Sequence, residues 1–282
     1  MAADSAASRM VAVWALVARQ AGGRGGHPSM QDLCAAAVAA IQVSGAGLMA
    51  VTRTGAVHVM CVTDEISERL ADIELTLGEG PRADASAFGG PALASDLTND
   101  DIMARWPAFA PAARAAGAAA VFAFPLQIGA IRVGVLELYR SQPRPLATVA
   151  LGDALLFADA ATLLLLESQQ ANGRDGHGQN GTGEQTGGGG RGHGPGGQPI
   201  ELGLRRAEID QATGMLTEQL ATGIAEAFVR LRAYAYAQDR RLADVARDIV
   251  TRRLRLTNGD GPGTGSGPAV VGGLEPDPGG AG

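Results

Sequence analysis

The residues best suited to chemistry lie in the C-terminal third of the chain, where arginines stand beside small and polar side chains. Guanidinium groups bind phosphate oxygens, and an aromatic ring can stack on an unpaired base, so these residue types could contact single-stranded nucleic acid. Each arginine is equally consistent with a solvated helix face, and the residues by themselves leave both interpretations open. Tyr234 either stacks in this way or packs in a core. Gly214 and Ala212 are small enough to let another backbone come close. The candidate contact residues are Arg205, Arg206, Gln211, Thr213, Gly214, Tyr234, Arg240, Arg241 and Arg247.

Catalytic and metal-binding groups are much less evident. Glu137 stands between two leucines in an apolar stretch, so strand alternation places it either on a solvated face or against a bound ligand. His58 has no second ligand at a useful spacing. The aspartates at positions 96, 100 and 101 lie in a polar stretch, where such residues serve turns and caps. The sequence therefore predicts a protein that is not an enzyme, with no metal site and no cofactor, and leaves Glu137 as a ligand-binding candidate.

The chain contains two cysteines, Cys34 and Cys61. Two are too few for a disulfide framework, and their spacing is not that of metal ligands. Each stands in an apolar pattern, so we expect both to be small core residues.

Three amphipathic patterns position the arginines. Apolar residues recur at spacings of three or four, which places each set on one face of a helix. We expect Thr222 to cap the second helix and Asp239 to cap the third. The three faces can share one core, so residues 199–257 are predicted to be a three-helix bundle. The apolar sets are Ile209, Ala212, Leu216 and Leu220; Ile224, Ala227, Phe228 and Leu231; and Leu242, Val245, Ala246, Ile249 and Val250.

The motifs IDQATGML, AFVRLRAYA and RRLADVARDIV, in this order, resemble the ANTAR domain of bacterial antitermination regulators. The resemblance implies binding to RNA hairpin loops, which prevents a terminator from forming, and it supports the contact residues named above. Thr213 stands where the family often has lysine.

Charge is unevenly distributed. The net charge is −6, which argues against a protein that coats nucleic acid, but residues 200–257 hold ten arginines against eight acids. Non-specific affinity for phosphate should therefore be weak, and specific binding should need base contacts or two copies of the module.

Residues 29–170 show helix, hairpin, irregular middle, hairpin and helix in turn, which predicts an α+β domain with an antiparallel sheet. Within it, residues 54–55 suit a hairpin turn, residues 78–81 predict an irregular loop, and residues 105–116 predict a short helix. An N-terminal helix covers residues 1–28; its segment MVAVWALVA also has the look of a short signal peptide, but an amphipathic helix is favoured. The motifs LGEGPRADA, DLTNDDIMARWPAF and FAFPLQIG-x-IRVGVLELYR resemble GAF domains. The resemblance implies a small-molecule sensor or a dimerisation unit, and Arg82 stands where relatives often have cysteine.

Glycine-rich residues 171–198 predict a flexible linker, and residues 258–282 a disordered tail. No apolar run was expected to reach the length of a membrane span. The sequence thus predicts a cytoplasmic, homodimeric antitermination regulator that binds hairpin loops of nascent RNA under the control of a GAF-like sensor. The alternatives are a helix-turn-helix DNA-binding regulator and a dimerising interaction protein that binds no nucleic acid.

Overall fold

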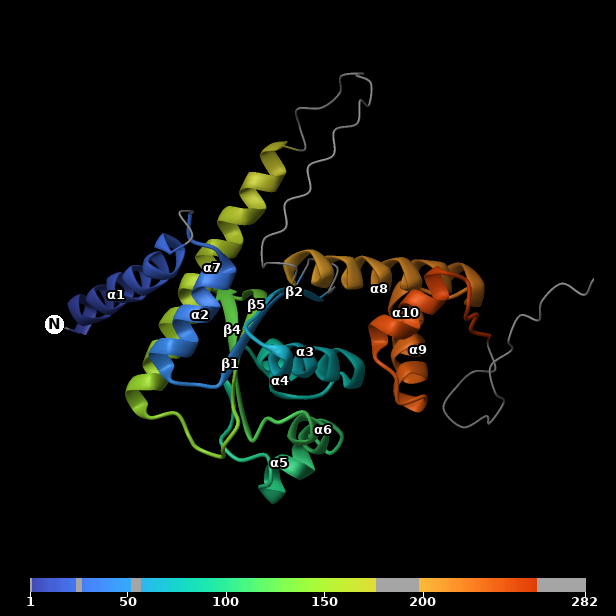
Figure 1. The fold of residues 1–282 in the computed structure, drawn as a ribbon, viewed down its shortest axis with the longest axis horizontal. Helices are drawn as coiled ribbons and strands as arrows, with labels where there is room; N and C mark the ends of the chain where they lie inside the picture. Colours follow the sequence, from blue (N-terminus) through green and yellow to red (C-terminus); the bar gives the residue numbers. More distant parts are fainter. Residues whose placement is uncertain (1, 24–26, 52–56, 176–197, 258–282) are drawn as a thin grey trace, which may run out of the picture. The chain divides into compact units, whose positions relative to one another are not determined.

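The computed structural model describes residues 2–23, 27–51, 57–175 and 198–257 (Figure 1). The chain divides into two compact units between Gly203 and Leu204. The N-terminal unit is an antiparallel sheet with helices, and the C-terminal unit is helical in its described part. The predicted fold class, α+β followed by an all-α bundle, is confirmed.

The sheet of the N-terminal unit has five strands in the order β2-β1-β5-β4-β3, and every neighbouring pair is antiparallel. At the centre, β5 pairs Glu137 with Gly47 of β1 and with Ala123 of β4. The hairpin of β4 and β5 turns at Gly129, which has a φ of 59°. The strands are β1 (Gly45–Val51), β2 (Val57–Val62), β3 (Ala92–Ala94), β4 (Ala120–Ile128) and β5 (Ile131–Arg140).

One face of the sheet packs against α2 (Met30–Ile41) and α7 (Thr148–Asp175), and α1 (Ala2–Gly22) packs against these two helices. Alternate strand residues such as Phe122 and Leu136 point into this core, where they meet Val17 of α1 and Phe157 of α7. The N-terminal helix is therefore part of the domain core. Figure 1 shows α2 and α7 together on this side of the sheet.

The other face packs against α3 (Glu65–Leu77), α4 (Pro81–Phe88), α5 (Asp100–Arg105) and α6 (Phe109–Ala115). Its core contains Trp106, Phe109 and the strand residues that alternate with those of the first face, such as Val135. The sheet is thus covered on both faces, and a polar residue on either face of the central strands is enclosed.

The segment between α3 and β4 departs from the sequence prediction. The loop expected at residues 78–81 leads directly into α4, because Pro81 occupies the first helical turn, where its missing N–H is not needed. The helix expected over residues 105–116 is shorter, since α6 begins at Phe109, and a further helix, α5, precedes it and ends at Arg105, so that Trp106 and Pro107 lie between the two. The Trp106 indole N–H donates to Asp84 Oδ2 at 3.1 Å, which ties this break to α4.

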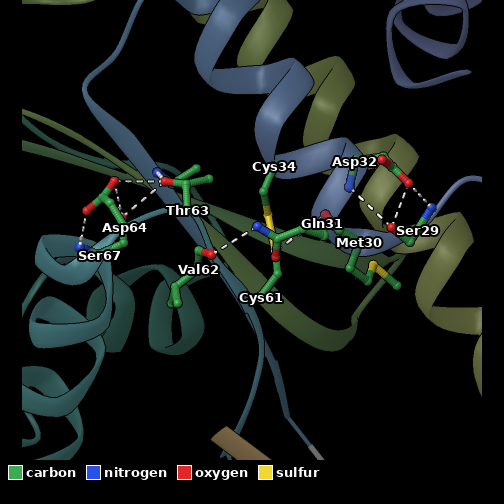
Figure 2. The surroundings of a disulfide bond; sticks show 11 residues. Ser29, Met30, Gln31, Asp32, Cys34, Cys61, Val62, Thr63, Asp64 and Ser67 are labelled. Atoms are coloured by element: carbon green, nitrogen blue, oxygen red, sulfur yellow. Dashed lines mark hydrogen bonds between the residues drawn. A yellow bond between two sulfur atoms is a disulfide. The ribbon is translucent and has the colours of Figure 1, made fainter. Parts of the chain in front are cut away.

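Cys34 and Cys61 are joined by a disulfide that links α2 to β2 (Figure 2). Both are buried, as expected of small core residues, but the bond between them was not predicted. Ser29 caps α2 in a capping box with Asp32, and the Gln31 amide donates to the Val62 carbonyl at 3.1 Å. These bonds place the start of α2 beside the end of β2, the two elements that the disulfide joins.

Helix α7 corrects the expectation that no apolar run is long enough to span a membrane. Thr148–Ser168 passes that test by length and composition alone. Its residues Ala154, Phe157, Ala161 and Leu165 are buried against the sheet, so this helix packs as part of the domain core.

The C-terminal unit contains α8 (Gln198–Leu220) from Leu204 onward, α9 (Ile224–Ala237) and α10 (Leu242–Val250). The apolar faces predicted from the sequence are buried in all three helices except at Ile224, which is exposed at the start of α9; Phe228 and Val250 are partly buried. Leu254 and Leu256, which follow α10, are buried as well. The predicted three-helix bundle is present.

The helix ends of this unit differ from the prediction. Ala221, Asp239 and Arg252 all have a positive φ, of 49°, 50° and 60°. After each helix an N–H bonds to the carbonyl five residues earlier: Thr222 to Thr217, Arg240 to Ala235, and Arg253 to Asp248. These are the 6→1 bonds of the Schellman motif. Asp239 therefore ends α9, whereas Arg241 is the N-cap of α10 and Gly223 that of α9, each without a side-chain capping bond.

Three predictions fall outside the described residues in whole or in large part: the hairpin turn at 54–55, most of the linker at 171–198, and the tail at 258–282. Within the described part, α7 continues to Asp175 and α8 begins at Gln198, so helix occupies both ends of the segment assigned to the linker.

Candidate nucleic-acid interface

Three of the predicted contact residues are exposed at and after the turn between α9 and α10. Arg240 and Arg241 lie immediately before α10, and Arg247 lies within it. Arg240 Nη2 is 2.7 Å from Asp248 Oδ2, and Arg247 Nε is 3.1 Å from Glu208 Oε1 on α8. Because both pairs are partly exposed to solvent, they orient the guanidinium groups at little energetic gain.

Helix α8 supplies the second part of the predicted set. Gln211 is exposed, whereas Thr213 is buried and its hydroxyl donates to the Ile209 carbonyl at 2.7 Å. The expectation that Thr213 lies on an exposed face is therefore wrong, because its side chain satisfies itself inside its own helix. Gly214 is half-buried, and a Cβ placed on it would meet no atom within 4 Å. Close packing does not account for this glycine.

The remaining candidates are placed less fully. Tyr234 on α9 is half-buried, so its position does not decide between stacking on a base and packing in the core. Arg205 and Arg206 lie within α8, but their side chains lie outside the described part of the structure. What the structure brings together on described surfaces is Gln211 on α8 and the three arginines around α10.

The geometry of α10 bears on the DNA-binding alternative. Five of its nine residues are buried: Leu242, Ala243, Val245, Ala246 and Ile249. A recognition helix must present several side chains along one face to base edges in a groove. With most of its surface in the core, α10 is poorly suited to that task, so recognition by residues around its start is favoured.

The N-terminal unit contains a buried polar cluster that the sequence predicted only in part. Glu137 on β5 is buried, as are Glu74 on α3 and Arg82 on α4. Arg82 donates through its backbone N–H to Glu74 Oε1 at 2.8 Å and through Nε to Glu74 Oε2 at 3.0 Å. Gly80 has a φ of 129° and faces the Glu74 carboxyl group, where a Cβ would collide with it. The solvated-face interpretation of Glu137 is therefore wrong.

The carboxyl groups of Glu74 and Glu137 influence one another inside the core, so two negative charges there are disfavoured. Burial raises the pKa of Glu137 well above its ordinary value, and the charge of Glu74 raises it further. Burial also raises the pKa of Glu74, although Arg82 opposes that change. The arrangement is a salt-bridged Glu74 beside a protonated Glu137, whose Oε2 has no hydrogen-bond partner within the described residues.

Sequence reasoning named Glu137 but missed its partners. Glu74 lies on the buried face of α3, but the helix contains many polar residues, so one more glutamate there gives no signal. Arg82 directly follows Gly80 and Pro81, and its position in the sequence does not indicate burial. Among the described residues, no group of three or more histidine, cysteine, aspartate and glutamate side chains is arranged to hold a metal ion.

Comparison with known families gives one match: residues 204–250 match the ANTAR domain model. The match begins inside α8 and ends at the last residue of α10, so it covers the three helices that carry the exposed arginines. A comparison with curated proteins gives no significant match.

Solved structures similar to the N-terminal unit include a domain of a two-component sensor histidine kinase protein from Sinorhizobium meliloti, with 16% identity, a TM-score of 0.42 and coverage of 51% of this chain and 92% of that one. They also include the GAF domain of a phosphoenolpyruvate-protein phosphotransferase from Coxiella burnetii, with 11% identity, a TM-score of 0.45 and coverage of 58% and 98%. A third is a type II free methionine-R-sulfoxide reductase from Thermoplasma acidophilum, with 14% identity, a TM-score of 0.38 and coverage of 49% and 90%.

The sheet covered on both faces agrees with the architecture that the three N-terminal motifs imply, and the family match covers the bundle that follows. The chain therefore combines an α+β domain, whose five-stranded antiparallel sheet has helices on both faces, with a C-terminal helical unit that matches the ANTAR domain model at residues 204–250.

Proposed function

We propose that this protein is a regulator that binds hairpin loops in nascent RNA through its ANTAR domain and so prevents a transcription terminator from forming. The observation that carries the proposal is the family match at residues 204–250, since ANTAR domains are RNA-binding antitermination modules. The exposed Gln211, Arg240, Arg241 and Arg247 supply the hydrogen-bond donors that unpaired bases and phosphates need.

Binding by a homodimer is part of the proposal. Residues 240–257 hold six arginines against two aspartates, whereas residues 204–239 hold four arginines against five acids. One module thus offers a small cationic surface, and two modules on neighbouring hairpins would multiply their affinities through effective concentration. We place the protein in the cytoplasm, where nascent transcripts are.

The GAF-like domain is proposed to be the sensory part, in a regulatory and not a catalytic role. Its support is the polar cluster of Glu74, Arg82 and Glu137 inside an apolar core, because a carboxyl oxygen without a partner can receive a hydrogen bond from a ligand.

The test is binding of the full-length protein to a pool of two-hairpin RNAs with randomised loops, compared with one-hairpin RNAs and duplex DNA across a salt series. We expect preference for two hairpins and enrichment of particular loop sequences. Equal, salt-sensitive binding to all three nucleic acids would contradict the proposal, and preference for the duplex would favour a DNA-binding regulator.

Arg240→Gln with Arg241→Gln should weaken hairpin binding at least tenfold, since each charge-assisted contact is worth roughly 1.5–3 kcal/mol. Arg69→Gln with Arg114→Gln is the matched control, because both residues are exposed in the N-terminal unit and the change in net charge is the same. If the variant with Arg240→Gln and Arg241→Gln still regulated its target transcripts in cells, the alternative of a dimerising interaction protein that binds no nucleic acid would be favoured.

A further inference from the structure

The residues that follow α10 lie beyond the family match, which ends at residue 250. Residues 251–257, here called the C-terminal strap, read TRRLRLT. Three of these seven residues are arginines, and none was among the contact residues predicted from the sequence.

The backbone of the strap is fixed to the bundle. The N–H groups of Arg253 and Leu254 both donate to the Asp248 carbonyl, at 2.7 and 3.0 Å, so the chain turns sharply at the end of α10. Leu254 and Leu256 are then buried against the helices, with 9% and 4% of their surfaces exposed. Burial of these two leucine side chains removes apolar surface from water and holds this short segment in place.

The arginines of the strap point the other way. Arg253 and Arg255 alternate with the buried leucines, and together with Arg252 all three are exposed. Within the described part of the chain none of these guanidinium groups takes part in an ion pair, unlike Arg240 and Arg247. Three cations without counter-charges, on a backbone held by buried leucines, form a surface suited to a polyanion.

We propose that the C-terminal strap is a second nucleic-acid-binding site, in which Arg252, Arg253 and Arg255 bind the phosphate backbone of the hairpin stem next to the loop. Such contacts carry no sequence information, and they set affinity and register while residues around the start of α10 read the loop. The inference rests on the proposed function, because it takes RNA to be the polyanion.

The test uses the full-length protein with Arg252, Arg253 and Arg255 all changed to Gln. The matched control changes Arg19, Arg69 and Arg114 to Gln: these arginines are exposed in the N-terminal unit, and their loss alters the net charge equally. Affinity for the two-hairpin RNA pool is measured from 50 to 200 mM salt. Circular dichroism confirms that each variant keeps its helices.

We expect the strap variant to bind all loop sequences more weakly by a similar factor. Each phosphate contact contributes about 0.7–0.9 to the slope of log affinity against log salt, so the slope should fall by about 2–3. Replacing the three arginines with lysine should restore most of the slope, because phosphate contact needs charge more than geometry.

Two outcomes overturn the inference: a slope equal to that of the control variant, or a loss confined to particular loop sequences, which would make the strap a base-reading element. Failure of the proposed function is distinguishable from both. In that case the unaltered protein shows no preference for hairpins, while the strap variant still loses affinity for every nucleic acid tested.

Discussion

The carboxyl group of Glu137 keeps its proton at pH values where an exposed glutamic acid has lost it, because burial and the neighbouring Glu74 both disfavour a second negative charge. The folded domain therefore holds a proton that the unfolded chain releases above the ordinary pKa of 4.5. By linkage, the contribution of this group to stability is present below that pKa and is lost as the pH rises through the raised value.

Glu137→Gln should remove this pH dependence, since an amide has nearly the same shape and cannot ionise. We expect the variant to lose less stability than the unaltered protein between about pH 5 and about pH 8. Both tryptophans, Trp14 and Trp106, lie in the N-terminal unit, so thermal unfolding followed by their fluorescence reports this domain alone. Glu65→Gln, at an exposed position, is the control; equal pH dependence in both variants would show that another group titrates.

Substitution of Gly214 should affect the stability of the bundle and its binding to RNA in opposite directions. Glycine inside a helix costs about 0.5–1 kcal/mol relative to alanine, and an added Cβ would meet no atom here, so Gly214→Ala should stabilise the bundle by that amount. If the open position admits an RNA strand, the same methyl group should weaken hairpin binding. Urea unfolding followed by circular dichroism and RNA binding of the full-length protein check the two effects. Higher stability with unchanged affinity would remove Gly214 from the interface.

At the scale of elements, the ANTAR helices share an unusual way of ending. Each Schellman motif places a residue with a positive φ after the helix, and this position normally favours glycine. Here the residues are Ala221, Asp239 and Arg252. A side chain in the left-handed region costs about 1 kcal/mol, so each helix ends at the expense of some stability.

Ala221→Gly should recover part of that cost and stabilise the bundle by up to about 1 kcal/mol, less what glycine adds to the entropy of the unfolded chain. The midpoint of urea unfolding of the bundle, followed by circular dichroism, measures the gain. Ala225→Gly, at an exposed position within α9, should instead destabilise the bundle. The idea fails if both substitutions shift the midpoint downward by the same amount.

The same helix ends show what the sequence could and could not predict about these elements. Apolar spacing identified the buried faces of α8, α9 and α10, because a period of 3.6 residues is set by the helix itself. The boundaries were missed because aspartate both caps helix starts and adopts a positive φ, and Asp239 does the second. Pro81 was interpreted as part of a loop for a similar reason, since proline suits turns as well as first helical turns.

At the scale of the whole molecule, the change in composition and charge along the chain predicts two domains joined by residues 171–198, and the two compact units of the structure meet between Gly203 and Leu204. The buried cluster of Glu74, Arg82 and Glu137 could not be predicted from the sequence. Its members are brought together by the packing of α3, α4 and β5, which no local sequence pattern encodes. Strand alternation correctly placed the side chain of Glu137 on the face of the sheet opposite to that of Leu136 and Leu138. It could not predict that helices cover both faces of the sheet.

The link between Cys34 and Cys61 has a mechanical consequence for the domain. It closes a covalent loop over a sequence separation of 27 residues, and this loop cannot lengthen when the chain is pulled from its ends. Both sulfur atoms are buried, so a reductant in solution should reach them only after α2 and β2 have come apart. A single molecule stretched with reductant present should therefore show, after the domain has unfolded, a separate increase in contour length of about 90 Å, from roughly 3.4 Å per released residue.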